Sequence, residues 1–196
     1  MKLEIHLIRH GTTEGNLKRW YYGALDIPLA PEGITEVEKY AAQGIYPRLD
    51  EANYYTSGLL RAEETFSLIY GDRKREIFPD FREVNFGRFE GKSHEELEDL
   101  EEYQAWIGDK TRTTPPPEGE SVPQFKKRVM GGLENLIKKN NCKGDAVVVC
   151  HGGVIGTIMN KLFPKKRDHF VQWIPDPGRG FVLVSKDGIP YDFRDI

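Results

Sequence analysis

Two patterns of hydrophobic and polar positions alternate along the chain. Short runs rich in apolar and β-branched residues predict strands at residues 2–8, 53–56 and 146–150, and a last strand with a turn within 178–188. The run at 146–150 is almost continuously apolar, which is typical of a strand covered on both faces. A shorter strand-like piece and an irregular loop rich in Phe and Gly are predicted within 75–91.

Apolar residues at helical spacing predict helices between these strands. The two clearest stripes are Ile34, Val37, Tyr40 and Ala41, and Val122, Phe125, Val129, Leu133, Leu136 and Ile137. Signals for helix ends are Pro31 in a first turn, Gly71 as a C-terminal stop, Ser93 with Glu96 and Ser121 with Gln124 as capping boxes, and Pro164 as a stop.

This order of elements predicts the fold class. Strands that alternate with helices favour an α/β three-layer sandwich, in which a mainly parallel sheet has helices on both faces. The length fits one domain over residues 1–196. The least regular part is 108–119, with three consecutive prolines, and together with the preceding loop it predicts a flap or insertion at about 80–120.

Composition narrows the classes of function. The net charge is -3, so no basic excess points to nucleic acid, and no apolar run is long enough for a membrane span. Glu4 and His6 interrupt the first apolar stretch, which therefore lacks the core of a signal peptide. Cys142 and Cys150 form neither a disulfide framework nor a CxxC site. We therefore expect a cytoplasmic protein with reduced thiols.

Polar motifs follow three of the predicted strands. They are Arg9-His10-Gly11 after the first strand, Ser57 with Arg61 one turn later after the second, and His151-Gly152-Gly153 after the third. The carboxyl ends of parallel strands lie at one edge of a sheet, where ligands of open α/β sheets bind. Arginines, histidines and helix N-termini repel one another there unless an anion lies between them. The motifs therefore predict an anion site.

Phosphate fits this site better than carboxylate, because a neutral imidazole attacks phosphorus to give a phosphohistidine. The surrounding cations would stabilise the transferred group. The leaving alcohol also needs a proton, and Glu83 is the candidate acid. It lies in the irregular loop among Phe81, Phe86 and Phe89, apolar surroundings that favour a neutral carboxyl group.

Other polar and aromatic residues have simpler interpretations. We expect His6, His94 and His169 to be structural or exposed, and Glu63, Glu64 and Glu90 to be surface carboxylates. Tyr21 and Tyr22 fit a substrate pocket and aromatic packing about equally well. Cys150, at the end of an apolar strand, is expected to be buried and inert.

Four stretches, "LIRHGTTEGN", "TSGLLRAEETF", "FREVNFGRFEG" and "VVVCHGGVI", occur in one order over about residues 3–160. In this the chain resembles the histidine phosphatase superfamily, in its phosphoglycerate mutase-like branch. The resemblance implies that no metal or cofactor is used. It implies these roles: His10 as phosphorylated nucleophile, Arg9, Arg61 and His151 as phosphate pocket, Glu83 as proton donor, and Asn16 as a further phosphate or substrate contact.

The resemblance says less about the residues that contact the substrate beyond its phosphate group. We include Gly152, Tyr22 and Gly23 among the candidate binding residues, although Tyr22 stands where the branch commonly has Gln. The chain is too short for the insertions of glycolytic mutases. "FGRFEG", the region of Trp106 and "PPPEGES" resemble most the α-ribazole phosphatases of cobalamin synthesis.

We therefore expect a metal-independent phosphomonoester hydrolase whose partner is a small phosphorylated metabolite, with α-ribazole 5'-phosphate as a candidate. A broad-specificity small-molecule phosphatase, a phosphoglycerate mutase and a non-catalytic phosphate-ligand binding protein stay open as alternatives. A metallohydrolase fits least, because the Asp/His clusters that it needs are missing from the sequence. A homodimer also stays open.

Overall fold

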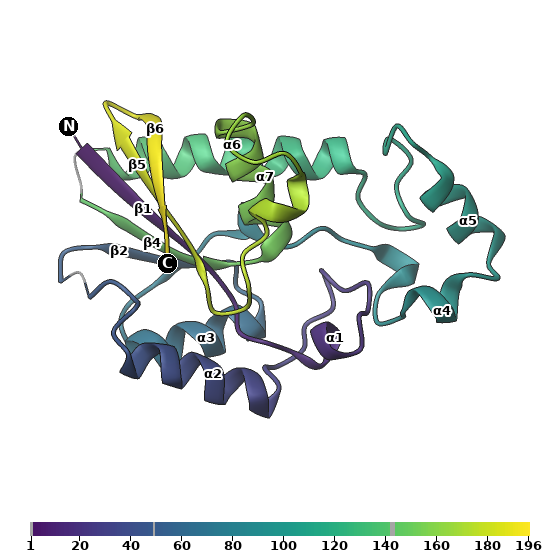
Figure 1. Ribbon diagram of the computed structural model, residues 1–196, viewed down its shortest axis with the longest axis horizontal. Helices are drawn as coiled ribbons and strands as arrows, with labels where there is room; N and C mark the ends of the chain where they lie inside the picture. The colour runs from purple at the N-terminus through teal and green to yellow at the C-terminus, as the bar shows by residue number, and fades with distance from the viewer. Residues whose placement is uncertain (1, 49, 142–143) are drawn as a thin grey trace.

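A mixed six-stranded sheet forms the centre of the computed structural model, which describes residues 2–48, 50–141 and 144–196 (Figure 1). The strands lie in the order β3-β2-β4-β1-β5-β6. Pairing is parallel from β3 to β1, and β5 and β6 are each antiparallel to the strand before them in that order. The strands are β1 (Lys2–Arg9), β2 (Asn53–Thr56), β3 (Glu76–Ile77), β4 (Ala146–Cys150), β5 (Gly180–Lys186) and β6 (Ile189–Asp195).

Helices cover both faces of this sheet, which confirms the predicted three-layer α/β sandwich (Figure 1). On one face lie α2 (Pro31–Ala42) and α3 (Leu60–Tyr70), and on the other lie α6 (Val122–Asn140) and α7 (Gly152–Leu162). The shorter helices are α1 (Glu14–Leu17), α4 (His94–Leu97), α5 (Glu101–Gly108) and the 3₁₀ turns Pro79–Phe81, Gly87–Phe89 and Phe170–Trp173.

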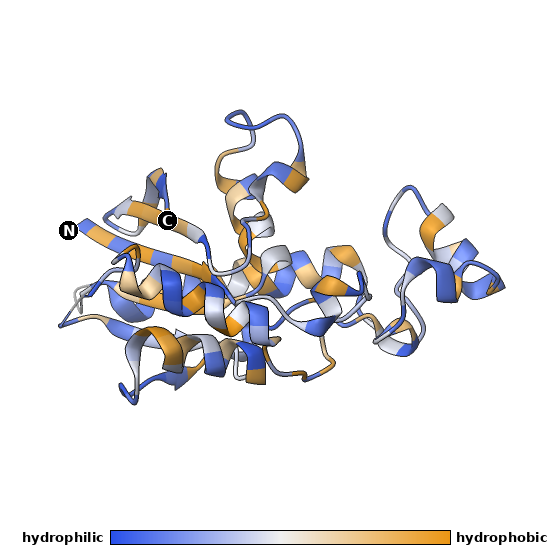
Figure 2. Cartoon of the chain, turned by 60° about the horizontal axis from the view of Figure 1, so that its bottom comes forward, coloured by the Kyte–Doolittle hydropathy of each residue, from blue (hydrophilic) through white to orange (hydrophobic). Residues whose placement is uncertain are grey.

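The hydrophobic core has one part on each side of the sheet. Leu3, Ile5 and Leu7 of β1 pack in the part that includes α6 and α7, whereas Ile8 packs with α3 on the opposite side. Every residue of β4 is buried, as its apolar run predicted. Figure 2 shows hydrophobic residues concentrated on the central strands. Burial on both faces fixes the sheet in position, and with it the carboxyl ends of the strands.

Most predicted helix ends are confirmed. Ser93 and Ser121 both form reciprocal capping boxes, and Gly71 ends α3 with a positive φ of 67°. The helix that starts after Ser93 is short, because the chain turns after Leu97 and a new helix begins at Glu101.

The turn between α4 and α5 has a packing reason. Leu97 and Tyr103 are both fully buried against Phe89. Six residues along one helix would place the two side chains about 120° apart around its axis. The break at Leu100, which has an extended backbone, brings both side chains to the same small core. This core supports the segment 80–120, which extends away from the sheet (Figure 1).

The strand expected at the end of the chain is followed by another one. β5 continues through a turn at Asp187 and Gly188, both with positive φ, into the edge strand β6. The Asp-Gly pair is a typical hairpin signal. The mostly exposed residues of β6 gave no apolar run from which a strand could be predicted. Among the described residues, no helix is both long and apolar enough to cross a membrane.

Candidate active site

Three strand ends meet at one edge of the sheet, as the sequence predicted. Arg9 ends β1 and pairs with Cys150 of β4, while Val149 of β4 pairs with Thr56 of β2. The residues that follow these strands are therefore neighbours in space. His151 is the N-cap residue of α7, and Arg61 lies in the first turn of α3.

The two histidines face each other inside the protein. The ring centroids of His10 and His151 are 5.1 Å apart, with an angle of 59° between the ring planes. His10 is 3% exposed and His151 is 0% exposed. The folded chain thus places two imidazoles from distant segments on one small site.

One ring nitrogen of His10 is free to act as a nucleophile. His10 Nδ1 lies 2.7 Å from the carbonyl oxygen of Gly11, so Nδ1 is the protonated nitrogen and Nε2 keeps the lone pair. Burial lowers the pKa of His10 well below its usual range, and the positive charges of Arg61 and Arg9 lower it further. His10 is therefore neutral near pH 7.

This environment predicts a pH profile. A lowered pKa keeps His10 in its neutral, nucleophilic form as the pH falls through 6.5, and that form is lost only below the lowered pKa. We expect kcat/KM, corrected for ionisation of the substrate, to show no decline between pH 7.5 and about 6. An acidic limb with its midpoint at or above 6.5 would contradict this assignment.

His151 has both nitrogens bonded within the protein. Arg61 Nε donates to His151 Nδ1 at 3.3 Å, so Nε2 is protonated and donates to Ser57 Oγ at 2.8 Å. Burial lowers the pKa of His151 well below its usual range, with Arg61 as the next cause. Ser57 is fully buried at the end of β2 and was not among the predicted site residues, although its position after that strand was visible.

Arg61 is held rigidly by its neighbours. Its Nη1 and Nη2 donate to the carbonyl oxygens of Leu25 and Gly23, both at 2.8 Å, and the whole side chain is buried. The ring of Tyr22 lies over the guanidinium at 5.0 Å. The cation is thereby fixed beside His151 and does not turn toward solvent.

Arg9 supplies the second cation and has an unsatisfied donor. Its Nη1 donates to the carbonyl oxygen of Pro175 at 2.7 Å, whereas Nε is buried and has no hydrogen-bond partner in the described part of the chain. Gly152 lies against this nitrogen, where a Cβ atom would come within 3.2 Å of it. A buried, charged N–H group without an acceptor is unfavourable, and an anionic oxygen would satisfy it.

Glu83 reaches the site from the loop that follows the 3₁₀ turn Pro79–Phe81. Its Oε2 accepts a hydrogen bond from Gly153 N at 2.8 Å, and its Oε1 accepts one from Val84 N at 3.0 Å. Burial lowers the pKa of both Arg9 and Arg61, and the negative charge of Glu83 opposes part of this lowering. The carboxylate therefore lies at the same site as the two cations.

The predicted aromatic surroundings of Glu83 are present only in part. Phe86 lines the same cavity as the carboxylate. Phe81 and Phe89 instead point into two separate cores, where both are fully buried. In the structure both carboxyl oxygens of Glu83 accept hydrogen bonds from backbone N–H groups, so polar contacts rather than phenylalanine rings surround much of the group.

The other predicted binding residues occupy supporting positions. Asn16 Oδ1 accepts from Thr13 N at 3.0 Å and completes the capping box of α1. The hydroxyl group of Tyr22 bonds to Thr13 Oγ1 at 2.8 Å, and its ring centroid lies 6.5 Å from that of His10. Gly23 has no room for a side chain, because a Cβ atom there would collide with the carbonyl oxygen of Val84.

Glu90 has a structural role that its sequence did not reveal. Its Oε2 accepts from Gly23 N and Leu25 N, at 2.8 and 3.0 Å, and its Oε1 accepts from Ala24 N and Phe86 N, at 2.9 and 2.8 Å. One carboxylate thus joins two loops through four backbone N–H groups. The expectation of a simple surface carboxylate was wrong for Glu90.

Removing the charge of Glu90 should therefore weaken the phosphate site. In Glu90→Gln an amide NH₂ faces backbone donors, and residues 23–25 lose part of the support that places their carbonyl groups on Arg61. We expect kcat/KM to fall about 10- to 100-fold, mainly through KM, with a parallel loss of affinity for inorganic phosphate. Glu64→Gln is the control, because Glu64 also accepts a backbone N–H group, but that of Leu29, which lies outside residues 23–25. Equal effects of both variants, or a fall in kcat alone, would contradict this role.

The fold and the site together define a class of protein. A sheet edge with one buried and one half-buried arginine, a neutral histidine with a free ring nitrogen, and a carboxylate 2.8 Å from a helix N-terminal N–H is the arrangement of an α/β enzyme that transfers phosphoryl groups. The chain belongs to the histidine phosphatase superfamily (branch 1), whose family pattern matches residues 5–188.

Known proteins support this assignment. The chain is 31% identical over 167 residues to an adenosylcobalamin/alpha-ribazole phosphatase of Escherichia coli K12, with 82% of this chain and 79% of that protein covered. The crystal structure of the alpha-ribazole phosphatase from Shigella flexneri superimposes with a TM-score of 0.81 and 25% identity, over 96% and 93% of the two chains. The crystal structure of a phosphoglycerate mutase from Thermus thermophilus superimposes with a TM-score of 0.68 and 30% sequence identity, over 93% of this chain and 92% of that chain. The chain is therefore an enzyme of the phosphatase type.

Proposed function

We propose that this enzyme hydrolyses the phosphate ester of a small metabolite through a covalent phosphohistidine on His10. The observation that supports this most directly is the neutral His10, whose Nε2 keeps its lone pair, beside the unpaired Nε of Arg9 and the fixed guanidinium of Arg61. These groups suit a tetrahedral dianion and an attacking nitrogen at once.

The reaction follows from these positions. His10 Nε2 attacks phosphorus, the bond from phosphorus to the ester oxygen breaks, and the leaving alkoxide takes a proton from Glu83. Water then attacks the phosphohistidine while the Glu83 carboxylate accepts its proton, which releases inorganic phosphate and neutral His10. Glu83 gives up one proton in the first step and regains one in the second, so its protonation is restored in each cycle.

A cavity of about 500 Å³ beside Glu83 supports an aromatic or otherwise flat leaving group. Glu83 and Gly153 lie at its wall, so the leaving oxygen would point into it. Its other lining side chains are mostly apolar and aromatic, among them Tyr21, Phe86, Trp106, Phe125 and Phe170. Together with the alpha-ribazole phosphatases among the similar proteins, this favours α-ribazole 5'-phosphate as the substrate.

A panel of substrates tests this proposal. Purified enzyme is assayed with α-ribazole 5'-phosphate, ribose 5-phosphate and 3-phosphoglycerate, with both phosphate release and isomer formation measured. We expect kcat/KM for the aromatic riboside to exceed that for ribose 5-phosphate about 100-fold or more, since burying the ring contributes roughly 3 kcal/mol. Isomerisation of 3-phosphoglycerate without phosphate release would replace the proposal by a mutase.

An assay in the presence of a strong chelator tests whether the reaction needs a metal ion. Phosphate release should persist in its presence, because every step above uses side chains alone. The cytoplasmic location and the single domain with its insertion at about 80–120 stay predictions from the sequence, and a homodimer stays open.

A further inference from the structure

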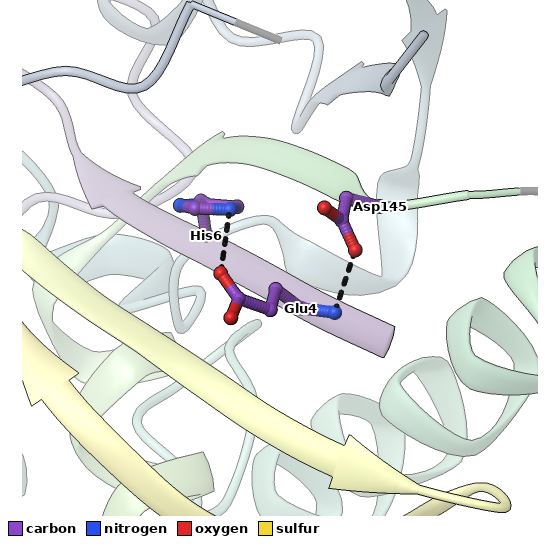
Figure 3. A group of neighbouring side chains, drawn as sticks. All are labelled: Glu4, His6 and Asp145. Atoms are coloured by element: carbon purple, nitrogen blue, oxygen red, sulfur yellow. Dashed lines mark hydrogen bonds and ion pairs between the residues drawn. The ribbon is translucent and has the colours of Figure 1, made fainter. Parts of the chain in front are cut away.

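A second cluster of polar side chains lies at the opposite end of β1 from His10. Glu4 and His6 are two residues apart and therefore lie on the same face of that strand. Asp145 immediately precedes β4. Ile5 pairs with Ala146, which places Asp145 beside Glu4, and Glu4 N donates to Asp145 Oδ1 at 2.8 Å. Figure 3 shows the imidazole and both carboxylates gathered over this part of the sheet.

His6 is the unusual member of the cluster. It is 2% exposed, yet among the described residues neither Nδ1 nor Nε2 has a hydrogen-bond partner. The nearest approach to a carboxylate is from Nε2 to Glu4 Oε2 at 3.8 Å, which is too long for a hydrogen bond (Figure 3). An imidazole that is closed off from both water and protein acceptors is unfavourable, and such a group points to a missing partner.

The donor types of the cluster suit a metal ion. An imidazole offers a nitrogen lone pair, which a carboxylate cannot use and a metal cation can. Glu4 and Asp145 add carboxylate oxygens beside this ring, so the nitrogen and oxygen ligands that divalent transition metals bind lie together.

We propose that Glu4, His6 and Asp145 bind a divalent transition metal ion, of which Zn²⁺ is the type. One ligand atom from each residue lies within 4.8 Å of the others. Zinc bonds of about 2.0–2.2 Å to nitrogen and oxygen place tetrahedral ligand atoms roughly 3.3–3.6 Å apart, so shifts of about 1 Å in these side chains suffice. A water molecule would complete the coordination from the solvent side of Glu4.

Two surface cations now neutralise Glu4. Lys2 Nζ lies 2.9 Å from Glu4 Oε1, and Arg194 forms an ion pair with both carboxylate oxygens. Their side chains are 64% and 52% exposed, so both are free to withdraw into water at little cost. Metal binding thus competes with these two ion pairs, and the competition gives the proposal a distinctive test.

The first experiment counts bound metal. Chelator-treated protein is dialysed against ZnCl₂, and zinc per chain is measured by elemental analysis. His6→Leu should bind one equivalent less than the unaltered protein, and the exposed His169→Leu should bind the same number. This difference separates the site from any zinc held by His10 and His151, which all these proteins share. Equal zinc content in His6→Leu and the unaltered protein would overturn the proposal.

The second experiment uses stability and competition. At a hundredfold excess over the dissociation constant, zinc should raise Tm by about 5–10 °C in the unaltered protein and leave His6→Leu unchanged. Asp145→Asn retains the acceptor for Glu4 N and should weaken zinc binding, whereas Arg194→Ala should tighten it several-fold by freeing Glu4. Weaker binding in Arg194→Ala would show that the arginine supports the carboxylates instead of competing for them, and would refute the site as drawn.

Discussion

Replacing His10 by alanine is expected to reduce kcat about 10⁴- to 10⁶-fold, because the variant has no atom that forms the covalent intermediate. The remaining cations still bind phosphate, so the affinity for inorganic phosphate should change far less than kcat. Steady-state assays with nitrophenyl phosphate measure the loss. Rapid acid quench with ³²P-labelled substrate should give a labelled protein with the unaltered enzyme and none with His10→Ala. His94→Ala, at an exposed histidine, serves as the control, and its kcat should stay within about threefold of that of the unaltered enzyme.

The proposal assigns the nucleophile to His10 and not to His151 on a difference in hydrogen bonding. Both histidines follow buried strands and both are followed by glycine, so their local sequences are alike. Only His10 keeps a free lone pair, because His151 Nδ1 accepts from Arg61 Nε. Labelled phosphate that remains in His10→Ala and maps to His151 would show that this hydrogen bond breaks during turnover, and would assign the nucleophile to the other ring.

The edge of the sheet could be predicted because it depends on short-range signals. Apolar runs mark β1, β2 and β4, and a parallel sheet brings the residues after them together whatever the connecting segments do. The position of His10, Arg61 and His151 at one site followed from these two facts alone. The long helices were equally visible, since each has a regular apolar stripe and a clear signal at one end.

The remaining features depend on contacts between segments far apart in sequence. Glu90 accepts from residues 23–25, and no local pattern marks a glutamate that will serve four distant N–H groups. The break between α4 and α5 exists because Leu97 and Tyr103 share Phe89. β6 exists because an Asp-Gly turn returns the chain to β5, although its own residues are largely exposed.

The same limit applies to Glu83, whose predicted surroundings the fold provides only in part. Its carboxylate accepts from Gly153 N and Val84 N instead of lying among three phenylalanines. The proposed acid role of Glu83 is therefore best tested through the leaving group. This makes the chemical identity of the leaving group the most informative variable, because an alkoxide needs a proton to leave and a nitrophenolate does not.

Glu83→Gln is accordingly expected to slow alkyl phosphates about 10²- to 10³-fold and to slow formation of the phosphoenzyme from nitrophenyl phosphate less than about tenfold. The glutamine oxygen still accepts one of the two N–H bonds, so the loop should keep its position. Phosphoenzyme formation is followed by rapid quench for ribose 5-phosphate and nitrophenyl phosphate in parallel. Glu120→Gln is the matched control, because Glu120 lines the same cavity and pairs with Arg128 at 2.7 Å. In Glu120→Gln, the ratio of the rates of phosphoenzyme formation from the two substrates should be the same as in the unaltered enzyme. An equal loss for both esters in Glu83→Gln would leave Glu83 as a group that positions Gly153, and the proton would have to come from elsewhere.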